Sequence, residues 1–182
     1  MRNLQIGVIG SCSDLNYSQR SIQIARSIGK NLAYTNCTLV FGAEKDSLSL
    51  STEAALSARK NNGLTIGVTY DIGLEIFKPE SASVVIATGL VRGGGREMVQ
   101  SLSCDSIIAI AGGSGTLNEI CVAYQAGIPV VVIDQFPGWS ANLSGKYLDA
   151  RKRYRFRAVK SARQAVAQAV KLAQVRINKE ND

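Results

Sequence analysis

The residue types best suited to chemistry are concentrated in one stretch of the chain, from Gly93 to Glu119. This stretch opens with three glycines and Arg96, passes through a short apolar run, and ends in a second glycine turn followed by Glu119. A glycine turn between a strand and a helix gathers unpaired backbone N–H groups and the positive end of the helix dipole at one point. We therefore predict a phosphate or other anion site formed by Gly112, Gly113, Ser114, Gly115 and Thr116.

Each of these features also has an interpretation that needs no ligand. The glycine turn is what a tight strand-to-helix connection requires, and Thr116 can cap the helix instead of donating its hydroxyl to an anion. Arg96 can clamp a phosphate or carboxylate through its planar guanidinium, or it can form a surface ion pair with Glu97 or Glu119. Glu119, about one turn into the second helix, can act on a ligand or simply interact favourably with the helix dipole.

Strands and helices alternate along the rest of the chain and can position this stretch. Runs such as Pro129–Ile133 are apolar without alternation, as in parallel strands that are covered on both faces. The alternation predicts one α/β domain of Rossmann-like type over residues 1–177, with a mostly parallel sheet, helices on both faces, and a frayed tail at 178–182. The expected strands are Leu4–Ile9, Thr38–Phe41, Leu64–Val68, Val84–Ala87, Ser106–Ala111, Pro129–Ile133 and Phe156–Val159. One expected helix begins near Ser18, and the others span Glu53–Lys60, Arg96–Leu102, Thr116–Gln125 and Ser161–Val175. A loop is expected from Phe136 to about Tyr147.

The amino-acid composition limits the class of protein and the reactions that the chain can catalyse. The chain has 182 residues, of which 46% are hydrophobic and 19% charged, as in a globular domain. It has no apolar run of the ~20 residues that cross a bilayer, and its opening is too short for a secretory signal, so we expect a cytoplasmic protein without a membrane partner. The absence of histidine excludes Ser-His and Cys-His mechanisms, and we expect neither a metal site nor a cofactor.

The four cysteines form no CxxC pair, and we expect them to be reduced and mostly buried. Cys12 differs from the other three because it follows the first predicted strand in a loop. Backbone N–H groups gathered in such a loop can lower the pKa of a thiol, which predicts a more reactive side chain at this position.

From Arg96 to Glu119 the chain resembles the Lonely Guy (LOG) family, once labelled "possible lysine decarboxylase", within a broader Rossmann-like nucleotide-binding superfamily. Arg96 falls on the family's arginine, Asp105 on its aspartate and Glu119 on its last glutamate, without a gap. The glycine turn of the family matches Gly112, Gly113, Gly115 and Thr116. The opening VIGSC is similar to the family's first strand and Gly-Ser turn, which adds Gly10 and Ser11 to the expected nucleotide-binding residues.

The resemblance implies an AMP-like nucleotide with its phosphate at the glycine turn, and a homodimer or higher homo-oligomer. It also implies Arg96 and Glu119 as the catalytic pair of a phosphoribohydrolase, a hydrolase that cleaves the base from ribose 5′-phosphate. Glu119 would stabilise positive charge on the ribose or activate a water. The chain departs from the plant-type pattern at Glu97, where the family has lysine, at Ala111, where it has proline, and at residues 42–46, where it has a glycine-rich loop. It is therefore closer to uncharacterised bacterial and archaeal members.

These departures leave two functions open. One is binding of a nucleoside 5′-monophosphate, with or without hydrolysis of its N-glycosidic bond. The other is a non-catalytic carrier or sensor of a larger phosphorylated compound, such as a molybdopterin-like cofactor or a signalling nucleotide. Binding of single-stranded nucleic acid by the basic run Arg151–Arg157 is a third, less favoured, alternative to packing of Tyr154 or Phe156 on the core.

Overall fold

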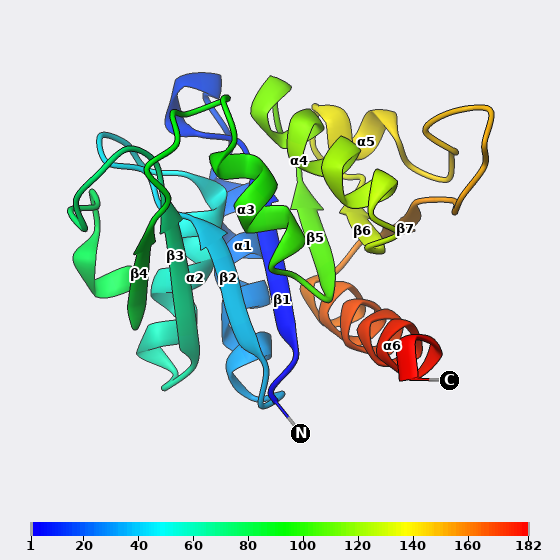
Figure 1. Cartoon of the computed structure of the whole chain (residues 1–182), viewed down its shortest axis with the longest axis horizontal. Coiled ribbons are helices and arrows are strands. Elements are labelled where there is room, and N and C mark those ends of the chain that lie inside the picture. The colour runs from blue at the N-terminus through cyan, green and yellow to red at the C-terminus, as the bar shows by residue number, and fades with distance from the viewer. Residues whose placement is uncertain (1, 182) are drawn as a thin grey trace.

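Seven strands form one sheet in which every strand pairing is parallel. The computed structural model describes residues 2–181, and within them the strand order is β4-β3-β2-β1-β5-β6-β7 (Figure 1). The predicted α/β, Rossmann-like fold is confirmed. The strands are β1 (Gln5–Gly10), β2 (Thr38–Gly42), β3 (Leu64–Thr69), β4 (Val84–Ala87), β5 (Ser106–Ile110), β6 (Val130–Ile133) and β7 (Arg157–Val159).

Helices cover both faces of the sheet, as predicted (Figure 1). One face carries α1 (Gln19–Ala33), α2 (Leu50–Lys60) and α6 (Ala162–Asn181). The other carries α3 (Arg96–Leu102), α4 (Ser114–Gln125) and the short α5 (Trp139–Asn142). Two single 3-10 turns, η1 (Ser13–Leu15) and η2 (Pro79–Ser81), lie in connections.

Successive strand residues point into two different cores. Val8 and Phe41 belong to the core under α1, α2 and α6, while their neighbours Ile9 and Val40 belong to the core under α4. Because both faces are covered, the strands are apolar at consecutive positions, and this is why their sequences show no polar–apolar alternation.

The direction in which the chain builds the sheet reverses beside β1. The chain moves outward from β1 through β2 and β3 to β4, and then returns to place β5 on the other side of β1. Gly10 at the end of β1 therefore lies opposite Ile110 at the end of β5. In open α/β sheets the connections that leave such a pair of strands diverge, and ligands bind in the crevice between them.

The starts of two helices differ from the predicted ones. α2 begins at Leu50 rather than Glu53, because Ser49 caps it by accepting a hydrogen bond from the Thr52 N–H at 3.1 Å. α4 begins at Ser114 with Gly113 in the cap position, so Thr116 lies inside the first turn and does not cap the helix. The predicted loop after Phe136 contains α5.

The C-terminal helix is longer than predicted. α6 continues to Asn181, so residues 178–181 are helical where the sequence predicted a frayed tail, and Asp182 lies outside the described residues. A buried row of alanines that includes Ala165 and Ala169 docks the helix on the sheet, and Arg176 comes within 4.0 Å of Asp105 near its end. Within residues 2–181, no helix is both long enough and apolar enough to cross a membrane.

Candidate functional site

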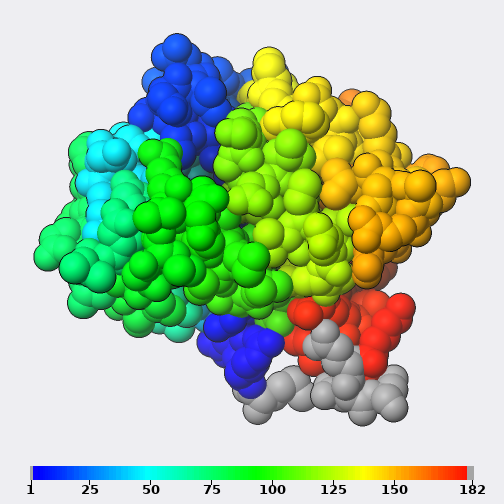
Figure 2. Space-filling model, turned by 45° about the horizontal axis from the view of Figure 1, so that its top comes forward, coloured from blue at the N-terminus to red at the C-terminus, as the bar shows by residue number. Residues whose placement is uncertain are grey.

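A cleft of about 350 Å³ opens at the carboxyl ends of the central strands. Its walls are the loop after β1, the end of β2 with the loop beyond it, the glycine loop before α3, and the first turn of α4. In Figure 2 the blue loop after β1, the green segment before α3 and the yellow-green α4 meet around this region. The predicted site residues that line the cleft are Gly10, Arg96, Gly113, Ser114, Gly115, Thr116 and Glu119.

The first turn of α4 contains residues of the predicted anion site. The helical hydrogen bonds begin with the Leu117 N–H, which donates to the Gly113 carbonyl at 3.0 Å. The N–H groups of Ser114, Gly115 and Thr116 precede that bond and have no partner within the helix. Apart from its chain neighbours and the backbone of its own helix, no described residue has a heavy atom within 4 Å of the position that a Cβ on Gly115 would occupy. Unpaired N–H groups at the positive end of a helix, beside open space, form an arrangement suited to phosphate.

Ser11 and Gly112 support this turn from behind, and neither lines the cleft. The Ser11 hydroxyl oxygen accepts a hydrogen bond from the Gly112 N–H at 2.9 Å, and both residues are buried. Gly112 has a φ of 97°, and a Cβ there would overlap the Thr116 side chain, so glycine is required. The structure thus brings the predicted residues together, but gives these two a positioning role.

Arg96 lies at the base of the cleft in a buried cluster of charges. Its Nη2 atom is 2.9 Å from Glu44 Oε1 and 3.3 Å from Glu97 Oε1, and its Nη1 atom is 3.8 Å from Glu119 Oε1. Only 4% of Arg96 is exposed. The alternative of a surface ion pair is therefore wrong, because the pairing is inside the protein. The predicted partners Glu97 and Glu119 are both present, and Glu44 is an additional one.

Glu97, which stands where the related pattern has lysine, holds the glycine loop. Both of its carboxylate oxygens are 3.0 Å from the Gly93 N–H. Gly42 at the end of β2 makes room for the neighbouring guanidinium, because a Cβ there would overlap Nη1 of Arg96. Glu97 is therefore a negatively charged partner for Arg96, whereas a lysine at this position would be a second positive charge beside a bound phosphate.

The pKa of Glu119 is the most informative one in the cleft. Burial raises it to about 8, against the lowering effect of Arg96, and the charges of Glu97 and Glu44 add to the increase. Glu119 is therefore mostly protonated at neutral pH. A protonated carboxyl can donate a proton, whereas the predicted roles, stabilising a cation or activating water, require the ionised form.

Sequence reasoning did not identify Glu44 and Arg92 as site residues. Glu44 lies two residues beyond β2, is 5% exposed, and contacts both Arg96 and Arg92, whose Nε is 3.4 Å from Glu44 Oε2. Arg92 comes just before the glycine run, and 43% of its side chain is exposed. The signal that points to Glu44 is its place directly after a buried strand next to β1, where site residues collect in parallel sheets.

Cys12 lines the cleft, but the predicted lowering of its pKa is wrong. Burial raises the pKa of the thiol to about 11, and the nearby charge of Glu44 raises it further. Arg92, whose Nη2 is 3.5 Å from the sulfur, opposes this without reversing it. All four cysteines are free thiols.

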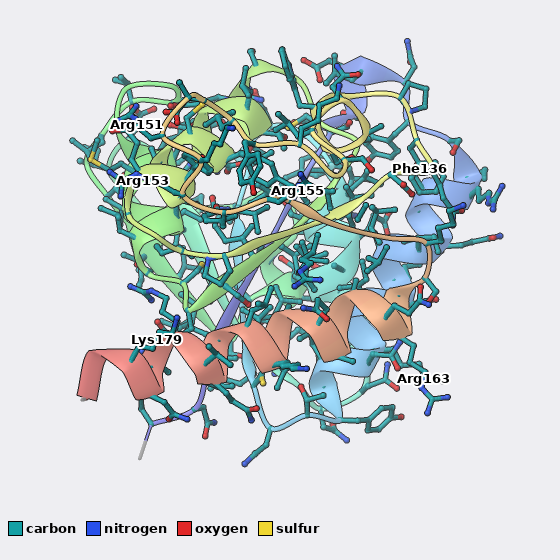
Figure 3. All side chains as sticks on the ribbon, turned by 90° about the vertical axis from the view of Figure 1, so that its right-hand side faces the viewer. Phe136, Arg151, Arg153, Arg155, Arg163 and Lys179 are labelled. Carbon is teal, nitrogen blue, oxygen red and sulfur yellow. The ribbon has the colours of Figure 1, made fainter. Side chains whose placement is uncertain are left out.

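The basic run before β7 uses its aromatic rings for packing. Tyr124 lies 4.8 Å from Tyr154 and 5.8 Å from Phe156, measured between ring centroids, and Phe156 is buried. The Tyr154 hydroxyl donates to the Ile128 carbonyl at 2.8 Å. These rings are thus not available to stack on bases, as the packing alternative predicted. The charged side chains Arg151, Arg153 and Arg155 are exposed along the same segment (Figure 3).

Comparison with known proteins gives the family. The family model described as the SLOG cluster4 family matches residues 3–170. The chain belongs to this family. The predicted resemblance to Lonely Guy-type Rossmann-like proteins is thereby confirmed.

Three similar proteins accompany this family match. A relative of this SLOG protein from Archaeoglobus fulgidus, described as an uncharacterized protein, is 29% identical over 129 residues, which are 70% of this chain and 78% of the relative. The X-ray structure of a protein designated TM1055 has the same fold, with a TM-score of 0.80, 24% identity, and coverage of 92% of this chain and 98% of that one. The molybdenum cofactor carrier protein of Chlamydomonas reinhardtii has a TM-score of 0.74 and 26% identity, over 95% of this chain and 99% of the other.

Proposed function

We propose that this protein binds a nucleoside 5′-monophosphate, or a closely related phosphorylated compound, with the phosphate at the start of α4. The observation that carries the proposal is the row of N–H groups on Ser114, Gly115 and Thr116 beside an open cleft. A cavity of about 350 Å³ is within the range of small-molecule sites, near its lower end. Arg92, half-exposed at the rim, can add a positive charge to the phosphate site.

Replacing Gly115 with aspartate tests the phosphate site. We expect the Gly115→Asp variant to remain folded, because space is open at its Cβ position and a carboxylate in the first turn of a helix is favourable to the dipole. The new charge would occupy the phosphate position and repel the ligand. We expect AMP binding, measured by calorimetry, to weaken by roughly a hundredfold or more, since like charges at close range cost several kcal/mol.

The matched control is Gln19→Asp. Gln19 is exposed in the first turn of α1, outside the cleft, so this variant places the same charge at another helix N-terminus. We expect it to bind AMP as the natural protein does. If the Gly115→Asp variant bound AMP as tightly as the natural protein does, the proposal that the phosphate lies at this position would be wrong.

We further propose that Glu119 and Arg96 can cleave the N-glycosidic bond of the bound nucleotide. In this reaction the bond between the base and C1′ of the ribose breaks, and water supplies the new C1′ hydroxyl. The leaving base takes up one proton, and the attacking water gives up one, which restores the proton of the donor. Protonated Glu119 is the group suited to deliver that proton. Arg96, whose charge is already balanced by the carboxylates of Glu44 and Glu97, would orient Glu119 rather than neutralise phosphate.

Hydrolysis is tested by incubating the protein with AMP or a modified adenine nucleotide and measuring the released free base by chromatography. If Glu119 acts as the proton donor, the rate should fall as the pH rises through about 8, because the donor form is lost above its pKa. The Glu119→Gln variant should bind AMP but release base at least about a hundredfold more slowly, within the usual contribution of a general acid. A rate that rises through pH 8 would contradict the proton-donor role, and binding without base release would leave a binding protein only.

A second candidate is a carrier of a larger phosphorylated cofactor. It is supported by the similarity to a molybdenum cofactor carrier protein and by the pairing of Arg96 with Glu97, which draws the arginine away from catalysis on a small substrate. Native mass spectrometry of protein purified from its own host separates the candidates. A co-purifying ligand heavier than AMP favours the carrier, and a bound nucleoside monophosphate favours the first proposal.

A further inference from the structure

One carboxylate oxygen in the cleft has a charge beside it but no hydrogen bond. Glu44 Oε1 accepts a hydrogen bond from Arg96 Nη2 at 2.9 Å. The second oxygen, Oε2, is buried and accepts no hydrogen bond from any residue that the structure describes, although Arg92 Nε lies 3.4 Å away. A buried carboxylate oxygen without a donor costs free energy, so such a group marks a place where a ligand donor fits.

The position of Glu44 in the fold indicates which part of the ligand would reach it. Glu44 follows β2, and the phosphate site follows β5, with β1 between these two strands. The two sites therefore lie about two strand spacings apart, roughly 10 Å between backbones, a span that a phosphorylated sugar and the side chains can bridge. In nucleotide-binding sheets an acidic residue beyond the second strand commonly accepts a hydrogen bond from a ribose hydroxyl.

We infer that Glu44 is the residue that selects a ribose ligand, by accepting a hydrogen bond from a sugar hydroxyl through Oε2. This inference rests on the proposed function, since it presumes a phosphate at α4. The same carboxylate disfavours a ligand that carries a second phosphate on the ribose, because two negative charges would then meet in a buried site. The site thus takes nucleoside 5′-monophosphates with an unmodified diol.

A purely structural role for Glu44 is the alternative. Arg96 also has the Glu97 carboxylate at 3.3 Å, so its charge does not depend on Glu44 alone. A counter-ion role uses Oε1 and leaves unexplained why Oε2 is without a hydrogen bond in a residue that lines the cleft. The two roles differ in one measurable respect. A structural role changes stability, whereas a selecting role changes the ratio of affinities between two ligands.

The test compares AMP with 2′,3′-dideoxy-AMP on the natural protein by calorimetry. We expect the dideoxy compound to bind about tenfold to a hundredfold more weakly, the usual effect of losing a hydrogen bond to a charged group. In the Glu44→Gln variant this ratio should shrink to within about threefold, because the neutral amide is a weaker acceptor. The control Asp46→Asn removes an exposed charge two residues away, outside the cleft, and should keep the full ratio.

The outcomes separate this inference from the proposal on which it rests. Equal affinities for AMP and the dideoxy compound overturn the role of Glu44 and leave the phosphate site intact. Full discrimination retained by a folded Glu44→Gln variant overturns it as well. Should that variant fail to fold, the ratio measured on the natural protein decides. If AMP does not bind at all, the proposed function fails, and the inference fails with it.

Discussion

Replacing Arg96 with methionine is expected to lower the free energy of unfolding by about 3–5 kcal/mol at pH 8, the usual cost of removing one partner from a buried ion pair. Methionine fills much of the same volume, so the loss reports charge rather than a cavity. Without the guanidinium, Glu44 and Glu97 remain buried, and Glu44 keeps the half-exposed Arg92 as an ion-pair partner. Denaturant unfolding followed by circular dichroism measures the effect.

The pH dependence of the Arg96→Met variant distinguishes this explanation from a general packing defect. A lower pH favours the uncharged form of a buried carboxyl group that has lost its counter-ion, so the loss of stability should be clearly smaller at pH 5 than at pH 8. The control Arg151→Met breaks an exposed ion pair with Asp149 and should change stability by less than about 1 kcal/mol at either pH. A loss that is equal at both pH values would contradict the charge argument.

Replacing Glu119 with glutamine is expected to stabilise the protein at pH 8, on the order of 3 kcal/mol. The folded pKa of Glu119 is about 8 and its ordinary value is 4.5. Between these values the unfolded chain loses a proton that the folded chain keeps, so the natural protein loses stability as the pH rises through this window. Glutamine does not titrate and escapes this loss, although it gives up part of the attraction to Arg96.

The gain in stability should grow with pH, which identifies the titration of Glu119 as its cause. At pH 5 the natural protein and the Glu119→Gln variant should have similar stability, and the difference should widen up to about pH 8 and then stay constant. A mutation that stabilises the fold while removing base release would mark Glu119 as a residue kept for function at the expense of stability. Destabilisation at pH 8 would show instead that Glu119 is ionised in the folded protein.

Most of the fold could be predicted because its signals are local. The edge strand Val84–Ala87 and the helix Arg96–Leu102 have the predicted bounds, since turn residues flank them in the sequence. The start of α2 could not be placed, because the serine-rich segment before Glu53 has a loop-like composition although Ser49 caps a helix there. The composition of a segment does not specify which of its serines is used as a cap.

Part of the candidate site could likewise be predicted from local sequence, and part could not. The glycine turn at 112–116 could be predicted, because backbone N–H groups at a helix start follow from local sequence alone. The pairing of Glu44 with Arg96 could not, because the two residues are 52 positions apart and meet only when β2 and α3 are packed together. The prediction of a lowered pKa for Cys12 was wrong for the same reason, since that pKa depends on burial and on Glu44, a residue distant in the sequence.

The place of β1 in the sheet has a consequence for how the chain folds. β1 pairs with β5 as well as β2, and Ile6 lies opposite Ser106, 100 residues later. During synthesis the first four strands can assemble while the backbone N–H and C=O groups on one edge of β1 are still unpaired, because β5 has not yet been made. Contacts so far apart in sequence slow folding, and an open strand edge invites pairing with other chains. The nascent protein is thus most prone to aggregate just before β5 leaves the ribosome.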